Sequence, residues 1–150
     1  MKIIATSDWH LGNMFHGNDR LPEHQHFLSW LLSQIEEQQP DALLIAGDVF
    51  DNGNPSAASQ SAYYGFLADA GERCPTMQIV ITAGNHDSAA KHTVSKVLWE
   101  TQNVHMVSYL TDGPVIEVPG KGWIAAVPYI NERSMPEGLF QTILDDIAGL

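Results

Sequence analysis

Three short apolar runs punctuate the first half of the chain, and each has the length of a β-strand. They occupy residues 2–6, 41–46 and 77–82 and are rich in Ile, Val, Leu and Ala. The second is apolar almost throughout, which is typical of a strand whose two faces are both covered. We therefore predict that these runs are neighbouring strands of a buried sheet.

Two longer segments with helical spacing separate these runs. Pro22 and Glu23 favour the start of a helix that Pro40 ends, because proline and an acidic side chain both suit a first turn. Ser56 can cap a second helix, which runs to about Glu72. Their expected inner positions are Phe27, Leu28, Leu31, Leu32 and Ile35 in the first helix, and Tyr63, Leu67 and Ala70 in the second.

The second half of the chain predicts more strands than helices. Residues 104–107, 115–118 and 123–128 have strand character, and the last two form a hairpin around Pro119 and Gly120. Val94, Val97 and Leu98 suggest one more helix, and residues 137–147 another. The alternation predicts an α/β fold, a mainly parallel sheet with helices on both sides, in one domain over residues 1–150.

Polar side chains follow each of the first three strands directly. Asp8 and His10 come after the first, Asp48 after the second, and Asn85 and His86 after the third. The carboxyl ends of parallel strands meet at one edge of a sheet, where ligands bind in open α/β folds. We therefore expect the five side chains to converge, and the alternative is that they are ordinary turn and cap residues.

The residue types at this edge suit a pair of divalent metal ions. A carboxylate and an imidazole on one loop favour Mn²⁺, Fe or Zn²⁺ over Ca²⁺ or Mg²⁺ alone. Asp48 can bridge two ions and Asn85 can bind the second, in the arrangement used for displacement at phosphorus. His86 is then free to act as a general acid, held by Asp87.

The motifs around these residues resemble those of the calcineurin-like metallophosphoesterases. They are Asp8-Trp9-His10, Gly47-Asp48-Val49-Phe50-Asp51 and Gly84-Asn85-His86-Asp87. The longer strings that begin at Thr6, Ala46 and Ala83, with Glu23-His24-Gln25 and Ala126-Val127-Pro128-Tyr129, are similar to the family's DNA-repair nucleases. The resemblance covers nearly all of the chain.

The resemblance implies a four-layer αββα sandwich, incomplete in this chain. Asp8 and His10 would hold the first metal ion, Asp48 would bridge, Asn85 would hold the second ion, and His86 would assist catalysis. The implied activity is Mn²⁺-dependent 3′–5′ exonuclease and endonuclease cleavage of DNA. The implied partners are a long coiled-coil ATPase and, for the full-length protein, a second copy of itself.

One departure from the family pattern limits this expectation. The family completes its site with a Gly-His motif and then a Gly-His-x-His motif, whereas only His92 and His105 follow residue 86 here, and neither follows glycine. We therefore read the chain as the amino-terminal part of a longer protein. We expect it to bind at most one metal ion well and to cut DNA negligibly by itself.

Charge and composition add constraints on the partner and the compartment. The net charge is −11, from 18 acidic and 7 scattered basic residues, so a polyanion would need metal ions or a separate basic surface. Cys74 is the single cysteine, so the chain cannot form an internal disulfide, which fits a reducing compartment. We expect Cys74 to be a small buried apolar side chain. No run approaches the roughly 20 apolar residues of a membrane helix. We expect a cytoplasmic protein without a membrane partner.

Two other functions stay open, as do the roles of several residues. One is a metallophosphatase acting on a small phosphoester, phosphoprotein or nucleotide. The other is a non-catalytic fragment, or a binding module that keeps the fold and part of the site. Trp9 either stacks on a substrate base or packs beside its loop, and Asp51 and Asp87 either serve the site or cap turns. Expected surface or helix-packing residues are His16, His24 and His26; expected surface residues are His92 and His105; expected core residues are Trp30, Trp99 and Trp123.

Overall fold

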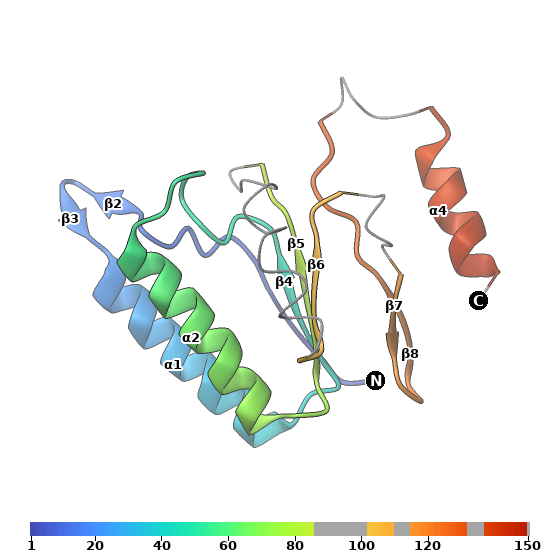
Figure 1. The fold of residues 1–150 in the computed structure, drawn as a ribbon, viewed down its shortest axis with the longest axis horizontal. Helices are drawn as coiled ribbons and strands as arrows, with labels where there is room; N and C mark the ends of the chain where they lie inside the picture. The colour runs from blue at the N-terminus through green and yellow to red at the C-terminus, as the bar shows by residue number, and fades with distance from the viewer. Residues whose placement is uncertain (86–101, 110–114, 132–136, 150) are drawn as a thin grey trace.

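A computed structural model describes residues 1–85, 102–109, 115–131 and 137–149 of the protein (Figure 1). The strands are β1 (Ile3–Thr6), β2 (Met14–Phe15), β3 (Asn18–Asp19), β4 (Ala42–Ala46), β5 (Gln78–Thr82), β6 (Val104–Val107), β7 (Val115–Val118) and β8 (Gly122–Ala125). The helices are α1 (Leu21–Gln38), α2 (Ala57–Arg73) and α4 (Leu139–Ala148). None of these helices is long and apolar enough to cross a membrane.

The central sheet has the order β1-β4-β5-β6, and all its strands are parallel. Its register places Ile3 opposite Ala42, Ala42 opposite Gln78, and Ile79 opposite Val104. The parallel sheet predicted from the apolar runs is therefore confirmed. Its three first strands all end at the same edge, the edge that carries the predicted site.

The two faces of the sheet are covered by different kinds of element. Helices α1 and α2 lie side by side on one face (Figure 1), and their apolar stripes pack with alternate residues of β4, β5 and β6. The antiparallel hairpin β7–β8 lies on the other face, where Ile116, Val118 and Ile124 pack against Ala42 and Val80. In the described part of the chain a second sheet therefore takes the place of the helices expected on that face, in keeping with the αββα layering.

Most element boundaries agree with the sequence to within two or three residues. Ser56 caps α2 as predicted, accepting a hydrogen bond from the Ser59 N–H at 3.1 Å. Helix α1 has no side-chain cap at Arg20. It ends at Gln38 and is capped by Gln39, which has a left-handed backbone and donates its N–H to the Ile35 carbonyl. The small hairpin β2–β3 was not predicted, and the helix suggested by Val94 to Leu98 lies outside the described residues.

Two of the three tryptophans expected in the core are at the surface instead. Trp30 is 53% exposed and Trp123 is 45% exposed, whereas Trp99 lies outside the described residues. Trp30 lies outside the buried stripe of α1, which consists of Leu28, Leu31, Leu32 and Ile35. Trp123 lies on the outward side of the β7–β8 hairpin, opposite Glu117, because strand residues alternate between the two faces.

Candidate metal centre

The loops after β1 and β4 are joined by backbone hydrogen bonds beyond the ends of the strands. The Asp8 N–H donates to the Gly47 carbonyl at 3.2 Å, and the His10 N–H donates to the Asp48 carbonyl at 3.0 Å. Leu11 then forms a parallel bridge with Phe50. The pairing of the two strands thus continues through the residues that carry the polar side chains.

Three of those residues have a left-handed backbone. Asp8, His10 and Asp48 have φ values of 55°, 45° and 50°. Asp and His are among the non-glycine residues that most often adopt this conformation. Each such residue turns the chain sharply, and Gly47 at φ 79° adds a further turn immediately before Asp48.

The side chains of Asp8, His10 and Asp48 meet at the carboxyl edge of the sheet. One ligand atom from each lies within 4.8 Å of the others, and His10 Nε2 is 3.9 Å from Asp8 Oδ1. Asp8 is exposed, and the other two are half-buried. Two carboxylates and one imidazole around a small space form a donor set that fits a divalent transition metal ion.

Asp48 is held against the loop after β5. A Cβ at Gly84 would overlap the Asp48 carboxylate and backbone nitrogen, and a Cβ at Gly47 would lie 3.0 Å from Gly84 Cα. The absence of a side chain at Gly84 therefore provides the space in which Asp48 sits. This contact brings the third strand's loop to the cluster formed by the first two.

Trp9, between Asp8 and His10, points into the core and is 6% exposed. Its indole N–H donates to Thr6 Oγ1 at 2.9 Å, and its ring makes edge contacts with Phe27, Tyr63 and Phe66. The packing alternative for Trp9 is therefore correct, because a buried ring is inaccessible to a stacking base. The side chain anchors the loop between the two candidate ligands.

Sequence reasoning left Asp51 undecided and gave no role to Asn13. Asp51 Oδ1 lies 3.7 Å from His10 Nδ1 and accepts a hydrogen bond from Asn13 Nδ2 at 2.7 Å. A signal was present in the sequence, since Asp51 lies three residues after Asp48 and Asn13 three after His10. Neither spacing reveals that the two side chains meet.

The other predicted site residues are only partly placed. Asn85 follows Gly84 directly and is exposed. His86, Asp87 and His92 lie outside the residues that the structure describes. His16 and His26 are exposed. His105 was expected at the surface but is half-buried, and its Nε2 lies 2.9 Å from Gln78 Oε1. His24 is half-buried; its burial, followed by the charge of Arg20, lowers its pKa.

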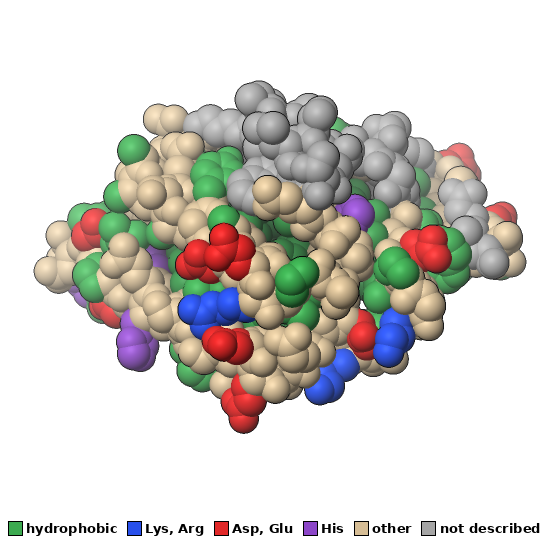
Figure 2. All heavy atoms as spheres, turned by 60° about the horizontal axis from the view of Figure 1, so that its bottom comes forward, with side chains coloured by type: hydrophobic (Ala, Val, Ile, Leu, Met, Phe, Trp, Pro, Cys, Tyr) green, Lys and Arg blue, Asp and Glu red, His purple; other side chains and the backbone are tan. Residues whose placement is uncertain are grey.

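The described basic side chains do not form a track around the site. Arg73 pairs with Glu36 at 2.7 Å, Lys121 with Asp41 at 3.4 Å, and Arg20 with Glu23 at 3.9 Å. On the face shown in Figure 2 the basic side chains stand singly, with acidic side chains nearby. In the part of the chain that the structure describes, positive charge is thus largely neutralised locally.

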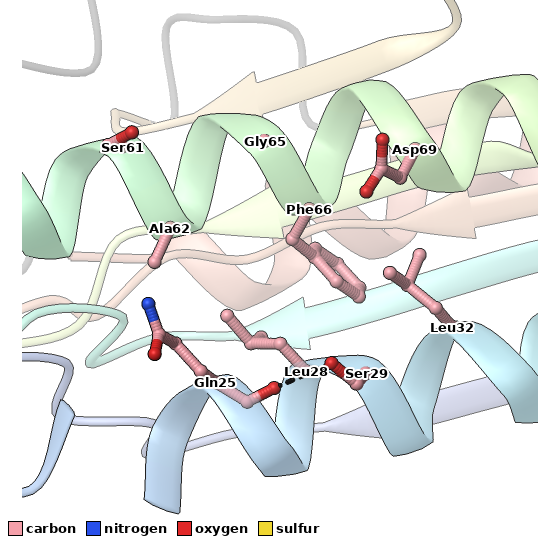
Figure 3. Close-up of a pocket in the computed structure, with 9 residues that line it drawn as sticks. All are labelled: Gln25, Leu28, Ser29, Leu32, Ser61, Ala62, Gly65, Phe66 and Asp69. Carbon is pink, nitrogen blue, oxygen red and sulfur yellow. Dashed lines mark hydrogen bonds between the residues drawn. The ribbon is translucent and has the colours of Figure 1, made fainter. Parts of the chain in front are cut away.

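A groove of about 300 Å³ lies between α1 and α2 (Figure 3). Leu28 and Phe66 form apolar parts of its wall, while Gln25, Ser61 and Asp69 provide polar groups. Asp69 is its single carboxylate, and no imidazole or thiol accompanies it. The groove therefore has no set of ligands for a metal ion.

The parallel sheet carries this cluster of candidate metal ligands at its carboxyl edge, and residues 1–146 match the calcineurin-like phosphoesterase family. The chain belongs to that family. It is similar to SbcD, one of the subunits of the nuclease SbcCD, in three bacteria. Identity is 36% over 149 residues in Bacillus subtilis, 41% over 114 in Rhodobacter capsulatus and 36% over 139 in Escherichia coli K12.

These alignments cover most of this chain but a smaller part of each relative. They include 95%, 76% and 90% of the chain, and 37%, 28% and 34% of the respective relatives. The chain therefore spans about a third of the length of the relatives it matches.

Proposed function

We propose that the chain is the amino-terminal part of the metallophosphoesterase domain of a DNA nuclease subunit of the SbcCD type. The observation that carries the proposal is the cluster of Asp8, His10 and Asp48 at the carboxyl edge of the sheet. The named nuclease relatives support DNA as the substrate. The reaction is hydrolysis of a phosphodiester bond.

In this proposal Asp8 and His10 would hold one ion, Asp48 would serve as a ligand to both ions, and Asn85 would hold the second. The proposed ion is Mn²⁺, as the family resemblance implies. A donor set that mixes oxygen and nitrogen also suits Fe or Zn²⁺, and Mg²⁺ is the remaining candidate. Bound divalent ions supply positive charge beside the phosphate and make water a better nucleophile. His86 protonates the leaving oxygen, and Asp87 orients its ring.

The partners and location follow from the same proposal. The full-length protein works on DNA with a coiled-coil ATPase of the SbcC type, forms a homodimer and is cytoplasmic. Of the four described Lys and Arg side chains, three pair with acids and Lys2 donates to the Gln38 carbonyl. The net charge is −11, so contacts to the DNA backbone must come largely from other residues or from the metal ions.

A phosphatase acting on a small phosphoester or nucleotide is the second candidate, and the acidic charge favours it. A small substrate needs no extended basic surface, whereas duplex DNA does. A third candidate is a catalytically incomplete module that keeps the fold and part of the site.

The test compares hydrolysis of linear duplex DNA with hydrolysis of a small phosphomonoester, each with Mn²⁺. In a protein that includes the Gly-His motifs, we expect DNA cleavage that Asp48→Ala abolishes. His86→Ala should slow cleavage about 10²–10⁴-fold, the usual contribution of a general acid, without loss of Mn²⁺ binding. Hydrolysis of the monoester alone would contradict the nuclease proposal.

The 150-residue chain alone should bind at most one Mn²⁺ ion well and cleave DNA negligibly. Two tight sites in a calorimetric titration, or cleavage that Asp48→Ala removes, would show that the downstream histidines are dispensable. A variant lacking His16 would then show whether that histidine completes the second site.

A further inference from the structure

The imidazole of His10 lies between two carboxylates. Its Nε2 is 3.9 Å from Asp8 Oδ1, on the side of the candidate metal cluster, and its Nδ1 is 3.7 Å from Asp51 Oδ1. Among the described residues the cluster within 4.8 Å comprises Asp8, His10 and Asp48, and does not include Asp51. The two carboxylates therefore face different nitrogens of the ring, and only one of them belongs to the cluster.

Asp51 is fixed to the loop that carries His10. Its backbone N–H donates to the Leu11 carbonyl at 3.2 Å, and its Oδ1 accepts from Asn13 Nδ2 at 2.7 Å. Asn13 in turn donates its backbone N–H to the His10 carbonyl at 3.0 Å. Two hydrogen bonds thus lead from the His10 carbonyl through Asn13 to Asp51, whose Oδ1 faces His10 Nδ1 at 3.7 Å, just beyond hydrogen-bond distance.

We propose that Asn13 and Asp51 are positioning residues, which fix the orientation and the tautomer of His10 so that Nε2 is the metal-binding atom. A carboxylate facing Nδ1 favours the form with the proton on Nδ1 and the lone pair on Nε2. Asp8 faces Nε2 and favours the opposite form, but its side chain is 64% exposed against 33% for Asp51, so solvent screens its charge more strongly. Asn13 acts one step further away, by holding the Asp51 oxygen that faces the ring. The inference rests on the proposed metal site and assigns it two residues that are not ligands.

The first test is Mn²⁺ affinity, measured by calorimetry on the wild type, Asn13→Ala, Asp51→Ala and the double variant. Loss of a group that orients a metal ligand typically weakens binding 10–100-fold, and we expect a loss in this range for each single variant. The double variant should lose little more than Asp51→Ala, because both residues act through one contact. Asp69→Ala is the control, since it removes an equal charge far along α2 in the groove of Figure 3.

Asn13→Ala is the decisive variant because it leaves the charge of the site unchanged. If Asn13→Ala binds Mn²⁺ with an affinity within twofold of the wild type, the proposed role of Asn13 is wrong. If Asp69→Ala loses as much Mn²⁺ affinity as Asp51→Ala, the effect of Asp51 comes from its charge alone and not from its contact with His10. Urea unfolding without metal checks that each variant is folded, and Asn13→Ser replaces Asn13→Ala if the latter is not.

The second test needs no metal. Long-range ¹H–¹⁵N spectra of the metal-free protein distinguish the two neutral tautomers, and the His10 signals are those missing from His10→Gln. We expect the Nδ1–H form in the wild type and a shift toward the Nε2–H form in Asp51→Ala. An unchanged tautomer would refute the inference. Failure of the wild type to bind Mn²⁺ would instead refute the metal site and leave this measurement valid.

Discussion

Gly84→Ala tests whether the close contact between the loops after β4 and β5 determines the position of Asp48. The new Cβ would lie 2.7 Å from Asp48 Cγ and closer still to Oδ1 and to the backbone nitrogen. Ordinary contacts begin at 3.4 Å, so the carboxyl carbon must move by about 0.7 Å or more. The backbone nitrogen cannot escape by a side-chain rotation, so the whole loop must shift.

A shift of this size exceeds what a metal site accepts. Ligand distances in proteins hold to about 0.2 Å, so Asp48 would leave its place in the shell. We expect Mn²⁺ affinity to fall about 100-fold or more, which corresponds to about 2.8 kcal/mol. Overpacking should also lower the free energy of unfolding by about 1–3 kcal/mol.

Calorimetry with Mn²⁺ and urea unfolding without metal measure the two effects separately. Gly65→Ala is a matched control, because a Cβ there meets nothing within 4 Å and the residue lies within α2. That change should leave Mn²⁺ affinity intact and stabilise the protein by about 0.5–1 kcal/mol. Wild-type affinity in Gly84→Ala would refute the argument that this contact places Asp48.

Three further predictions concern the cap of α2, the packing of Trp9 and the burial of His24. Ser56→Ala removes the cap of α2 and should lower the free energy of unfolding by about 1 kcal/mol, whereas an unchanged urea midpoint would contradict the cap. Trp9→Ala should cost about 3–5 kcal/mol in the same assay and Trp9→Phe clearly less, so equal losses would argue against a packing role. Burial lowers the pKa of His24 below its unfolded value of 6.5, so its neutral form is favoured in the folded state. Unfolding free energy should therefore rise as pH increases through the folded-state pKa toward 6.5, and fall on acidification through the same window. His24→Gln should remove this part of the pH dependence, and identical profiles from about pH 5 to 8 would refute it.

The sequence was sufficient for the parallel sheet because apolar runs and strand ends are local signals. It placed β6 and β7 with their observed bounds and put Asp8, His10 and Asp48 at one edge. The roles of Asn85, His86 and Asp87 stay predictions.

What the sequence missed depends on contacts between segments. The β2–β3 hairpin has strands of two residues each, too short for any periodicity. The meeting of Asn13 with Asp51 spans 38 residues, and it requires the pairing of two loops that only the folded sheet brings together. Trp30 was misplaced because the size of an apolar side chain was taken as a sign of burial, although its position on α1 faces outward.

The left-handed backbone at three candidate ligands has a consequence for selection experiments. Such a conformation costs a non-glycine residue on the order of 1 kcal/mol or more, and Asp8, His10 and Asp48 all adopt it. Glycine would relieve this cost at each position while deleting a ligand. A screen that rewards heat resistance alone would therefore recover Asp8→Gly and Asp48→Gly as improvements, so the site survives only where its chemistry is selected as well.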